Sequence, residues 1–178
     1  AFSTIANNDK VGVVFFSNKI EKYKKKKKGK THVLHIIREL LSFEPTSKGT
    51  DMAQALQYFA NAQKRHCTAF LISDFIGTGA VDKPLLIASN RHEVNAIQIY
   101  DRREAELPNI GLVKFHDAES NSNLWIDTSL ATIRNNYAQA WKQNQDSLEQ
   151  LFTRTGVKHV SVRTDEDYVK ALMHLFRC

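Results

Sequence analysis

The sequence AFLISD, at residues 69–74, indicates the fold class because it is a short apolar run that ends on a serine and an aspartate. VGVVFF at residues 11–16 and VNAIQIY at residues 94–100 are runs of the same kind. Such runs are typical of strands that are covered on both faces in a mainly parallel sheet. Between them, apolar residues recur at helical spacing in two sets: Val33, Ile36, Ile37, Leu40 and Leu41, and then Met52, Ala55, Leu56 and Phe59. The alternation predicts an open α/β sheet with helices on both faces.

The rest of the chain continues this alternation and contains no internal repeat and no Pro- or Ser-rich linker. Its pattern predicts, in order, a helix at 81–90, a hairpin of strands 112–116 and 124–127, a helix at 129–153, a strand at 158–162 and a helix at 165–176. Gly156 would end the long helix in a left-handed conformation, and Thr164 or Asp165 would cap the last helix. Residues 1–178 are therefore predicted to form a single domain.

The composition is that of a globular protein, with 42% hydrophobic and 25% charged residues in a chain of 178. This balance excludes wholesale disorder. Cys67 and Cys178 are the only cysteines, and no other thiol lies at metal-ligand spacing, so neither a disulfide framework nor a zinc site is indicated. No apolar stretch approaches the roughly 20 residues of a membrane span. The sequence predicts a cytoplasmic protein without a membrane segment.

Much of the net charge of +6 is local, because eight of the 25 basic residues lie between Lys19 and Lys30. Lys24–Lys28 form an unbroken lysine run, which we expect to be largely solvated on a sheet edge or an exposed connection. Such a run can contact nucleic acid, anionic lipid or an acidic protein face. The alternative is a solvated surface that discourages aggregation between sheets.

Polar residues follow the predicted strands at the end where open α/β sheets bind their ligands. They are Ser17, Asp74 and Asp101, and the loop TSKGTD at residues 46–51 should approach the same edge. Asp74 is a candidate metal ligand, a candidate catalytic acid or base, or a cap for the following loop. Thr50 and Asp51 precede a helix, so an N-cap is the simpler explanation of both. The sequence contains no nucleophile elbow, phosphate loop or dinucleotide-binding motif.

Seven segments carry a family resemblance: NNDKVGVVFFSNKIEKY, KGKTHVLHIIRELL, KGTDMAQAL, FLISDF, YDRREAELPNIGLVKFHDAES, WIDTS and RTDEDYVKALMHLF. Together and in this order, they resemble the bacterial "domain of unknown function 58" family of von Willebrand factor A-like proteins over residues 1–177. The resemblance implies a von Willebrand A-like, Rossmann-like three-layer sandwich with a mainly parallel sheet that lacks its first strand here. It also implies work with a MoxR-type AAA+ ATPase in the assembly or maturation of other proteins.

The same resemblance implies a metal-ion-dependent adhesion site made of an Asp-x-Ser-x-Ser turn, a threonine and a final aspartate. Thr50 matches the threonine and Asp74 matches the final aspartate, whereas Asp-x-Ser-x-Ser does not occur in the chain. We therefore expect Mg²⁺ in the intact parent protein and weak binding or none in this chain. Thr50 and Asp74 should lie near each other, with Asp51 directed at the N-terminus of its own helix.

Ala1 lies within helix-like sequence without a recognisable cap, which indicates a fragment. In the family's fold, the first strand lies between the strands that end at Phe16 and Ser73. Its loss leaves unpaired backbone groups on both neighbours, which are costly to bury. We expect the chain to close the gap, to exchange segments with another copy in a dimer, or to retain a separate piece of chain.

Three functions remain open on these grounds. The leading hypothesis is a protein-interaction module rather than an enzyme, in which a partner's Asp or Glu completes the coordination of Mg²⁺. The alternative is a metal-dependent phosphoesterase or nuclease that uses Asp74, Asp101 and Asp51, with the lysine run guiding an anionic substrate. The third is nonspecific nucleic-acid binding through Lys22–Lys30. Tyr23 is the only aromatic residue there that could stack on bases, so nucleic acid is the least favoured partner.

Overall fold

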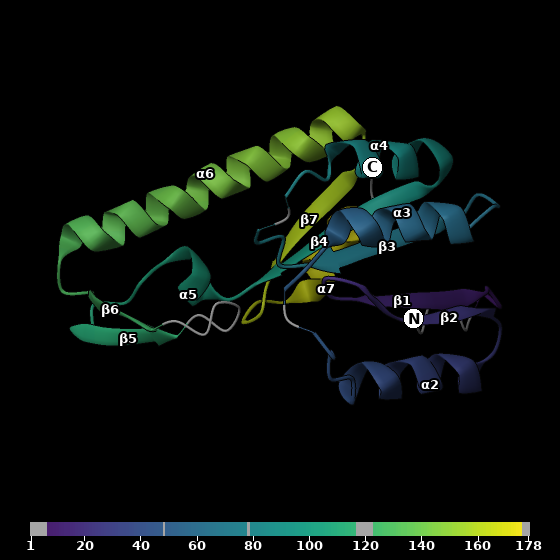
Figure 1. The fold of residues 1–178 in the computed structure, drawn as a ribbon, viewed down its shortest axis with the longest axis horizontal. Coiled ribbons are helices and arrows are strands. Elements are labelled where there is room, and N and C mark those ends of the chain that lie inside the picture. Colours follow the sequence, from purple (N-terminus) through teal and green to yellow (C-terminus); the bar gives the residue numbers. More distant parts are fainter. Residues whose placement is uncertain (1–6, 48, 78, 117–122, 176–178) are drawn as a thin grey trace. The chain divides into compact units, whose positions relative to one another are not determined.

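The structure, a computed structural model, describes residues 7–47, 49–77, 79–116 and 123–175 (Figure 1). The chain is a mixed α/β protein that divides into two compact units, residues 1–64 with 77–84 and residues 65–76 with 85–178. That residues 1–178 act as a single domain stays a prediction. Residues 1–6 and most of the predicted loop at 117–123 lie outside the described residues.

The first unit is built on an antiparallel hairpin of β1 (Val11–Phe16) and β2 (Ile20–Lys27). Successive side chains of a strand point to opposite faces. Tyr23 of β2 points to one face, where its ring meets Tyr58 of α3 (Met52–Ala62) edge to face. Lys22 and Lys24 point to the other face, toward α2 (Lys30–Leu41). The hairpin therefore lies between α2 and α3 (Figure 1).

The strand predicted at residues 11–16 is confirmed, but the prediction that it joins a mainly parallel sheet is wrong. Among the described residues, β1 pairs only with β2, in antiparallel orientation. The physical reason is the short turn at residues 17–19, because antiparallel strands can be joined locally whereas parallel strands need a long crossover. β2 itself was not predicted as a strand, since lysine is depleted in strands.

The hairpin contains a β-bulge opposite Gly12. Val11 pairs with Lys27 and Val13 pairs with Lys24, so β2 carries one residue more than β1 in this interval. An added Cβ on Gly12 would lie 2.9 Å from the carbonyl oxygen of Lys24 and 3.2 Å from the amide nitrogen of Lys26. Glycine at position 12 therefore allows the backbones of β1 and β2 to approach each other this closely. A bulge of this kind increases the local twist of the hairpin.

The second unit contains a parallel sheet of three strands, in the order β3 (Thr68–Ser73), β4 (Glu93–Tyr100) and β7 (Lys158–Arg163). α4 (Asp82–Arg91) makes the crossover from β3 to β4, and its residues 82–84 belong to the first unit. The strands predicted at 69–72, 94–100 and 158–162 and the helix predicted at 81–90 are thus confirmed, and these strands are parallel as expected.

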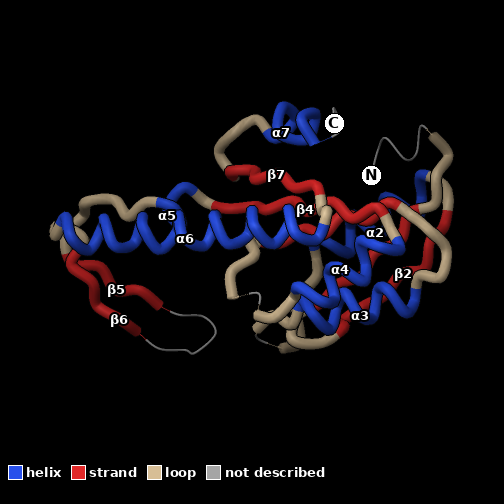
Figure 2. Tube along the Cα trace, turned by 90° about the horizontal axis from the view of Figure 1, so that it is seen from above, coloured by secondary structure: helices blue, strands red, loops and turns tan. Residues whose placement is uncertain are grey.

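The core of the second unit lies between the sheet and α6 (Ala131–Thr155), whose long rod is clear in Figure 2. Phe152 of α6 is buried, and its ring stacks on His159 of β7 with 4.8 Å between the centroids. Ala96, the register partner of His159 on β4, is fully buried on the same face. Gly156 follows α6 with φ 66° and ψ 22°, the left-handed conformation expected from the sequence.

The remaining elements of the second unit are α5 (Arg102–Ala105), the antiparallel hairpin of β5 (Leu112–His116) and β6 (Asn123–Asp127), and α7 (Tyr168–Leu175). The hairpin was expected. The last helix begins later than expected, because Arg163 pairs with Asp165 and Glu166 in a turn. Asp167, rather than Thr164 or Asp165, accepts a hydrogen bond from the amide of Val169. None of the helices in the described ranges is long and apolar enough to cross a membrane.

Candidate functional site

Asp74 lies directly after β3, at the carboxyl edge of the parallel sheet, and is exposed. Its Oδ1 accepts a hydrogen bond from the amide of Ile76 at 3.1 Å and one from Oγ of Ser73 at 3.4 Å. Ser73 Oγ also accepts from the amide of Phe75 at 3.1 Å. Asp74 is thus a cap for the following turn, one of the roles considered for it, and its position at the strand end is as predicted.

The turn after Asp74 contains a buried residue in an unfavourable backbone conformation. Phe75 has φ 57°, in the left-handed region that costs a residue with a side chain about 1–2 kcal/mol. Its side chain is only 1% exposed and meets the ring of Phe152 edge to face, with 5.3 Å between the centroids. Burial of the ring offsets the backbone strain. The turn that carries Asp74 is therefore anchored in the core.

A chain of hydrogen bonds ties this turn to the other two strands of the sheet. Gln98 of β4 is 3% exposed, and its Nε2 donates to the backbone carbonyl of Asp74 at 3.2 Å. Ser161 of β7 donates from Oγ to Oε1 of Gln98 at 2.8 Å. A buried amide that is bonded at both ends fixes the backbone next to it. The carbonyl of Asp74 is consequently held by groups from β4 and β7.

Asp101 follows β4 at the same sheet edge and also caps a helix. Its Oδ1 accepts from the amide of Arg103, the second residue of α5, at 2.8 Å. Its Oδ2 accepts from Oγ1 of Thr164, beyond the end of β7, at 3.2 Å. Both carboxylate oxygens of Asp101 are engaged in holding the local fold. The catalytic role considered for Asp101 from the sequence stays a prediction.

In the first unit, Asp51 caps α3 as predicted, because its side chain accepts from the amide of Gln54 at 2.8 Å. The amide of Asp51 donates to the carbonyl of Ser17, just beyond β1, at 2.8 Å. Thr50 precedes this cap and is exposed. Thr50 and Asp74 belong to different units, so their expected proximity stays a prediction.

The loop that carries Thr50 is tied to the hairpin by a cluster around Glu21, which the sequence did not predict. Thr46 donates from Oγ1 to Oε2 of Glu21 at 2.6 Å and from its amide to Oε1 at 3.1 Å. Ser17 and Ser47 donate to Oε1 at 2.8 and 3.2 Å. Oδ1 of Asn18, at 2.6 Å, is an alternative acceptor for the single hydroxyl proton of Ser47. The hydrogen bond from Thr46, with those from Ser17 and Ser47, lowers the pKa of Glu21 from 4.5 to about 2.

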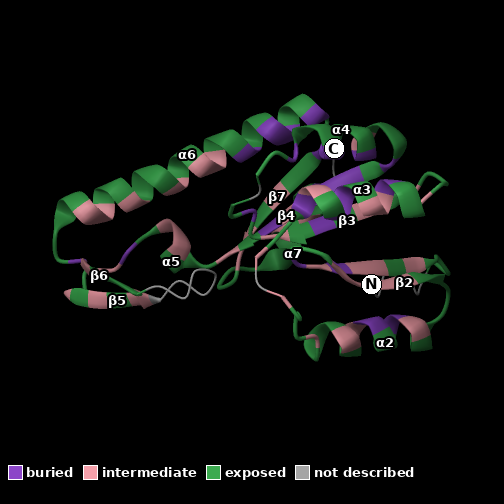
Figure 3. Cartoon of the chain, viewed as in Figure 1, coloured by how far each residue is buried: buried purple, intermediate pink, exposed green. Residues whose placement is uncertain are grey.

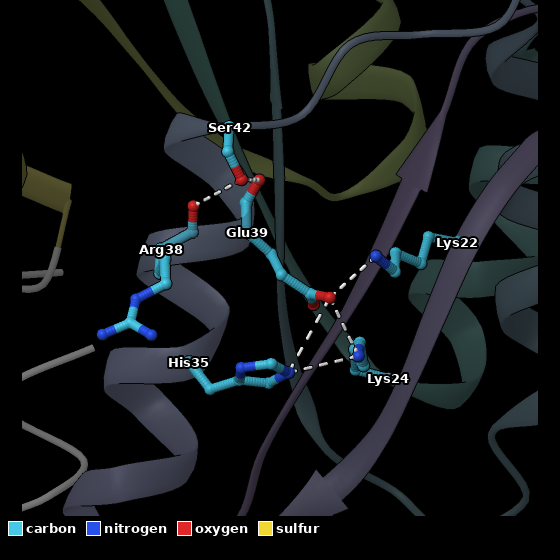
Figure 4. A network of polar contacts seen from close by, with 6 residues as sticks. All are labelled: Lys22, Lys24, His35, Arg38, Glu39 and Ser42. Carbon is cyan, nitrogen blue, oxygen red and sulfur yellow. Dashed lines mark hydrogen bonds and ion pairs between the residues drawn. The ribbon is translucent and has the colours of Figure 1, made fainter.

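A second carboxylate network joins β2 to α2 in the same unit (Figure 4). Oε1 of Glu39 accepts from Nζ of Lys22 at 2.7 Å and from Nζ of Lys24 at 3.0 Å. Nε2 of His35 lies 3.3 Å from the same Nζ of Lys24. These two lysine hydrogen bonds lower the pKa of Glu39 from 4.5 to about 2. The prediction of a solvated run holds for Lys25–Lys28, which are exposed, and is wrong for Lys24, whose partner on α2 cannot be read from the local sequence.

The two lowered carboxyl pKa values predict a loss of stability in acid. Because Glu21 and Glu39 bind protons more weakly in the folded state, their contribution is complete above about pH 4.5 and is lost as the pH falls toward 2. Urea midpoints measured by circular dichroism should fall over this window. The fall should be shallower in Glu39→Gln and unchanged in Glu149→Gln, a control on the exposed surface of α6. An identical slope for the wild type and Glu39→Gln would contradict the assignment.

Thr50 and Asp74 do not by themselves fit a Mg²⁺ site. Mg²⁺ prefers an octahedral shell of oxygen ligands, whereas Thr50 offers one neutral oxygen and Asp74 one carboxylate whose Oδ1 already caps a turn. Within the described ranges, no three His, Cys, Asp or Glu side chains come together in a group that could hold a metal ion.

Residues 1–147 match the family described as "Protein of unknown function DUF58". A similar protein, described as "Uncharacterized protein MAV169" from Mycobacterium avium, is 30% identical over 135 residues, which cover 75% of this chain and 78% of that protein. "Uncharacterized protein Rv1480" from Mycobacterium tuberculosis is 31% identical over 145 residues, or 79% of this chain. The match spans 45% of that longer protein.

Two crystal structures share the fold. One is the conserved hypothetical protein BatB from Bacteroides thetaiotaomicron, with a TM-score of 0.55 and 14% identity over 98% of this chain and 82% of that one. The other is described as an aerotolerance-related membrane protein from Bacteroides fragilis, with the same TM-score and identity over 96% and 81% of the two chains. At 14% identity, the likeness concerns the arrangement of helices and strands alone.

Proposed function

Because the chain belongs to the DUF58 family, we propose that it is a protein-interaction module of the von Willebrand A type. In this proposal it works with a MoxR-type AAA+ ATPase in the assembly or maturation of other proteins, in the cytoplasm, where ATP is available. The names of the two BatB-like structures, one of them aerotolerance-related, are compatible with such a role. The matched region spans less than half of Rv1480. Any activity that depends on a longer protein is therefore part of this proposal.

The observation that carries the proposal is the fixed presentation of Asp74. Its side chain is exposed, while its backbone is held by Gln98 and the next residue, Phe75, is buried in the core. A polar group on a rigid support loses little conformational entropy when a partner binds, and such preorganisation strengthens binding. The arrangement suits recognition of a protein surface by a carboxylate.

We propose binding rather than catalysis, because each of the three aspartates considered for catalysis has an evident role in the local fold. Asp74, Asp101 and Asp51 each accept a hydrogen bond from a backbone amide of the segment that follows. The alternative of a phosphoesterase or nuclease would be supported by Mg²⁺- or Mn²⁺-dependent cleavage of a generic phosphodiester that is lost in Asp74→Ala.

Binding to a purified MoxR-type AAA+ ATPase tests the proposal directly. We expect Asp74→Ala to weaken the complex at least tenfold in calorimetric titration. Asp127→Ala is the matched control, because Asp127 also follows a strand and accepts from the amide of Ser129 at 2.9 Å, in a different part of the unit. Wild-type affinity in Asp74→Ala, or an equal loss in both variants, would argue against Asp74 as the recognition residue.

The proposed metal site requires an Asp-x-Ser-x-Ser turn. This motif does not occur in the 178-residue sequence. Titration of this chain with Mg²⁺ and Mn²⁺ should therefore show only association in the range of ~1 mM or weaker, typical of sites with few ligands. A longer protein that contains such a turn should bind Mg²⁺ tightly. In that protein, Asp74→Asn should abolish the tight binding, although asparagine can still cap the turn after β3. Micromolar binding by the chain alone that Asp74→Ala removes would contradict the expectation.

A further inference from the structure

The hairpin of β5 and β6 is a two-stranded sheet that exposes large apolar side chains. Among the described residues, the two strands pair only with each other. Leu112, Leu124 and Trp125 are 65%, 61% and 60% exposed, and Figure 3 shows exposed and intermediate residues along both strands. An isolated hairpin is at best marginally stable in water, and a further strand or a helix normally supports it. The hairpin therefore offers an apolar surface to a partner.

The base of this hairpin is held firmly on the rest of the second unit. Thr128, which follows β6, is 1% exposed. Its Oγ1 donates to the carbonyl of Gly111 at 2.7 Å and accepts from the amide of Ile110 at 3.1 Å. Its own carbonyl accepts from Nη1 of Arg134 in α6 at 2.7 Å. A surface that is fixed beforehand loses little entropy when it binds, so the two strands are presented in a form ready for association.

The two outer edges of the hairpin differ in charge. The edge of β5 carries the exposed Lys114 in its middle, and a lysine on an edge strand discourages another strand from pairing there. β6 has the sequence NLWID, whose one charged residue, Asp127, is the last. Two copies of β6 in parallel would set their Asp127 residues side by side, which is destabilising. In antiparallel orientation, these carboxylates lie at opposite ends, so charge favours antiparallel pairing of β6 with itself.

The order of residues along β6 is also complementary to itself. When Trp125 lies opposite Trp125 of a second copy, Leu124 lies opposite Ile126, and Asn123 lies opposite Asp127. Aromatic and aliphatic pairs of this kind stabilise neighbouring strands, whereas mismatched pairs do not. The register also keeps side chains of one face on one side of the combined sheet, because they alternate along each strand. Two hairpins would thus become one sheet of four strands.

We propose that the chain forms a two-fold symmetric dimer through antiparallel pairing of β6 with β6 of a second copy. Both copies use the same surface, so the assembly closes at two. The strand contributes five residues, fewer than the roughly 20–30 per side of a stable interface. The dimer should therefore be weak and depend on concentration. Asp74 takes no part in this pairing, so failure of the dimer and failure of the recognition proposed for Asp74 can be told apart.

Sedimentation velocity of the whole chain, from about 5 to about 500 µM, tests the proposal. We expect monomers at the low end of this range and dimers at the high end, as for a small interface. Trp125→Glu should weaken the dimer at least about tenfold, because two carboxylates then meet on the axis. Within each copy, the new carboxylate lies opposite Lys114 and supports the hairpin. The control is Leu86→Glu on α4, where Leu86 is 43% exposed, and it should stay within about twofold of the wild type.

A mixture of two variants tests the position of the axis. Trp125→Lys should also weaken the dimer, because two ammonium groups meet. An equimolar mixture of Trp125→Glu and Trp125→Lys should associate at least about threefold more strongly than either variant alone, because opposite charges then meet. A mixture no better than its components would overturn the proposal. So would a dimer that Trp125→Glu leaves unchanged, assemblies larger than a dimer, or a chain that stays monomeric and instead floats with phosphatidylcholine vesicles.

Discussion

Replacement of Phe75 by alanine is expected to lower the free energy of unfolding of the second unit by about 3–5 kcal/mol, the usual cost of truncating a buried phenylalanine. Phe75 is 1% exposed and packs on Phe152, so alanine would leave a cavity in the core next to α6. Trp125 and Trp141 both lie in the second unit, and their fluorescence during urea unfolding reports on it.

The backbone conformation of Phe75 adds a sharper test. Glycine is normally less stable than alanine, but at φ 57° it avoids the strain that alanine keeps. Phe75→Gly should therefore be more stable than Phe75→Ala by about 1 kcal/mol. Ile76, the next residue, is 53% exposed, and Ile76→Ala should change stability by no more than about 0.5 kcal/mol. If alanine proved more stable than glycine at position 75, the left-handed turn would be refuted.

Gly12→Ala is expected to destabilise the first unit by about 1–3 kcal/mol, the typical cost of forcing extra atoms into a packed site. The new Cβ would lie 2.9 Å from the carbonyl oxygen of Lys24, a backbone atom that cannot rotate away. The bulge opposite Gly12 would have to widen, which disturbs the pairing of β1 with β2. Urea unfolding followed by far-ultraviolet circular dichroism measures the change.

The side chain of Lys26 also approaches this position, with Cγ 3.0 Å from the added Cβ. A flexible side chain can move, so the penalty of Gly12→Ala should persist in a Lys26→Ala background. A penalty that disappears in this background would show that the backbone around the bulge is not the obstacle, and would contradict the register of β1 with β2.

The strands of the parallel sheet could be predicted because their signal is local. Runs such as AFLISD are short and rich in β-branched and aromatic residues, which favours a strand, and their bounds agree with β3, β4 and β7 to within two residues. The expectation that these strands are covered on both faces is wrong for β3, because Phe70 and Ile72 are 45% and 54% exposed. β2 was not predicted, because the contacts that stabilise it are not local. Its lysines are stabilised by Glu39 on α2 and by pairing with β1, and neither partner is visible in the local pattern.

The candidate site shows the same contrast between local contacts, which could be predicted, and distant contacts, which could not. The cap made by Asp51 was predicted because its partner, the amide of Gln54, is three residues away. The Glu21 cluster was not, because its partners in the loop lie 25 and 26 residues away and follow no motif. The bond from Gln98 to the carbonyl of Asp74 spans 24 residues and could not be predicted either. Contacts of this kind depend on how the strands pair, which single residues do not encode.

The parallel pairing of β4 with β7 has a consequence for how quickly the protein folds. Gln98 and Ser161, which bond across these strands, are separated by 63 positions in the chain, whereas β1 and β2 pair across a turn of three residues. Closing a long loop costs entropy before the contact repays it, and chains rich in distant contacts fold slowly. The hairpin of β1 and β2 should thus form early in refolding. Docking of β7, and with it the fixed carbonyl of Asp74, should be the late and rate-limiting event.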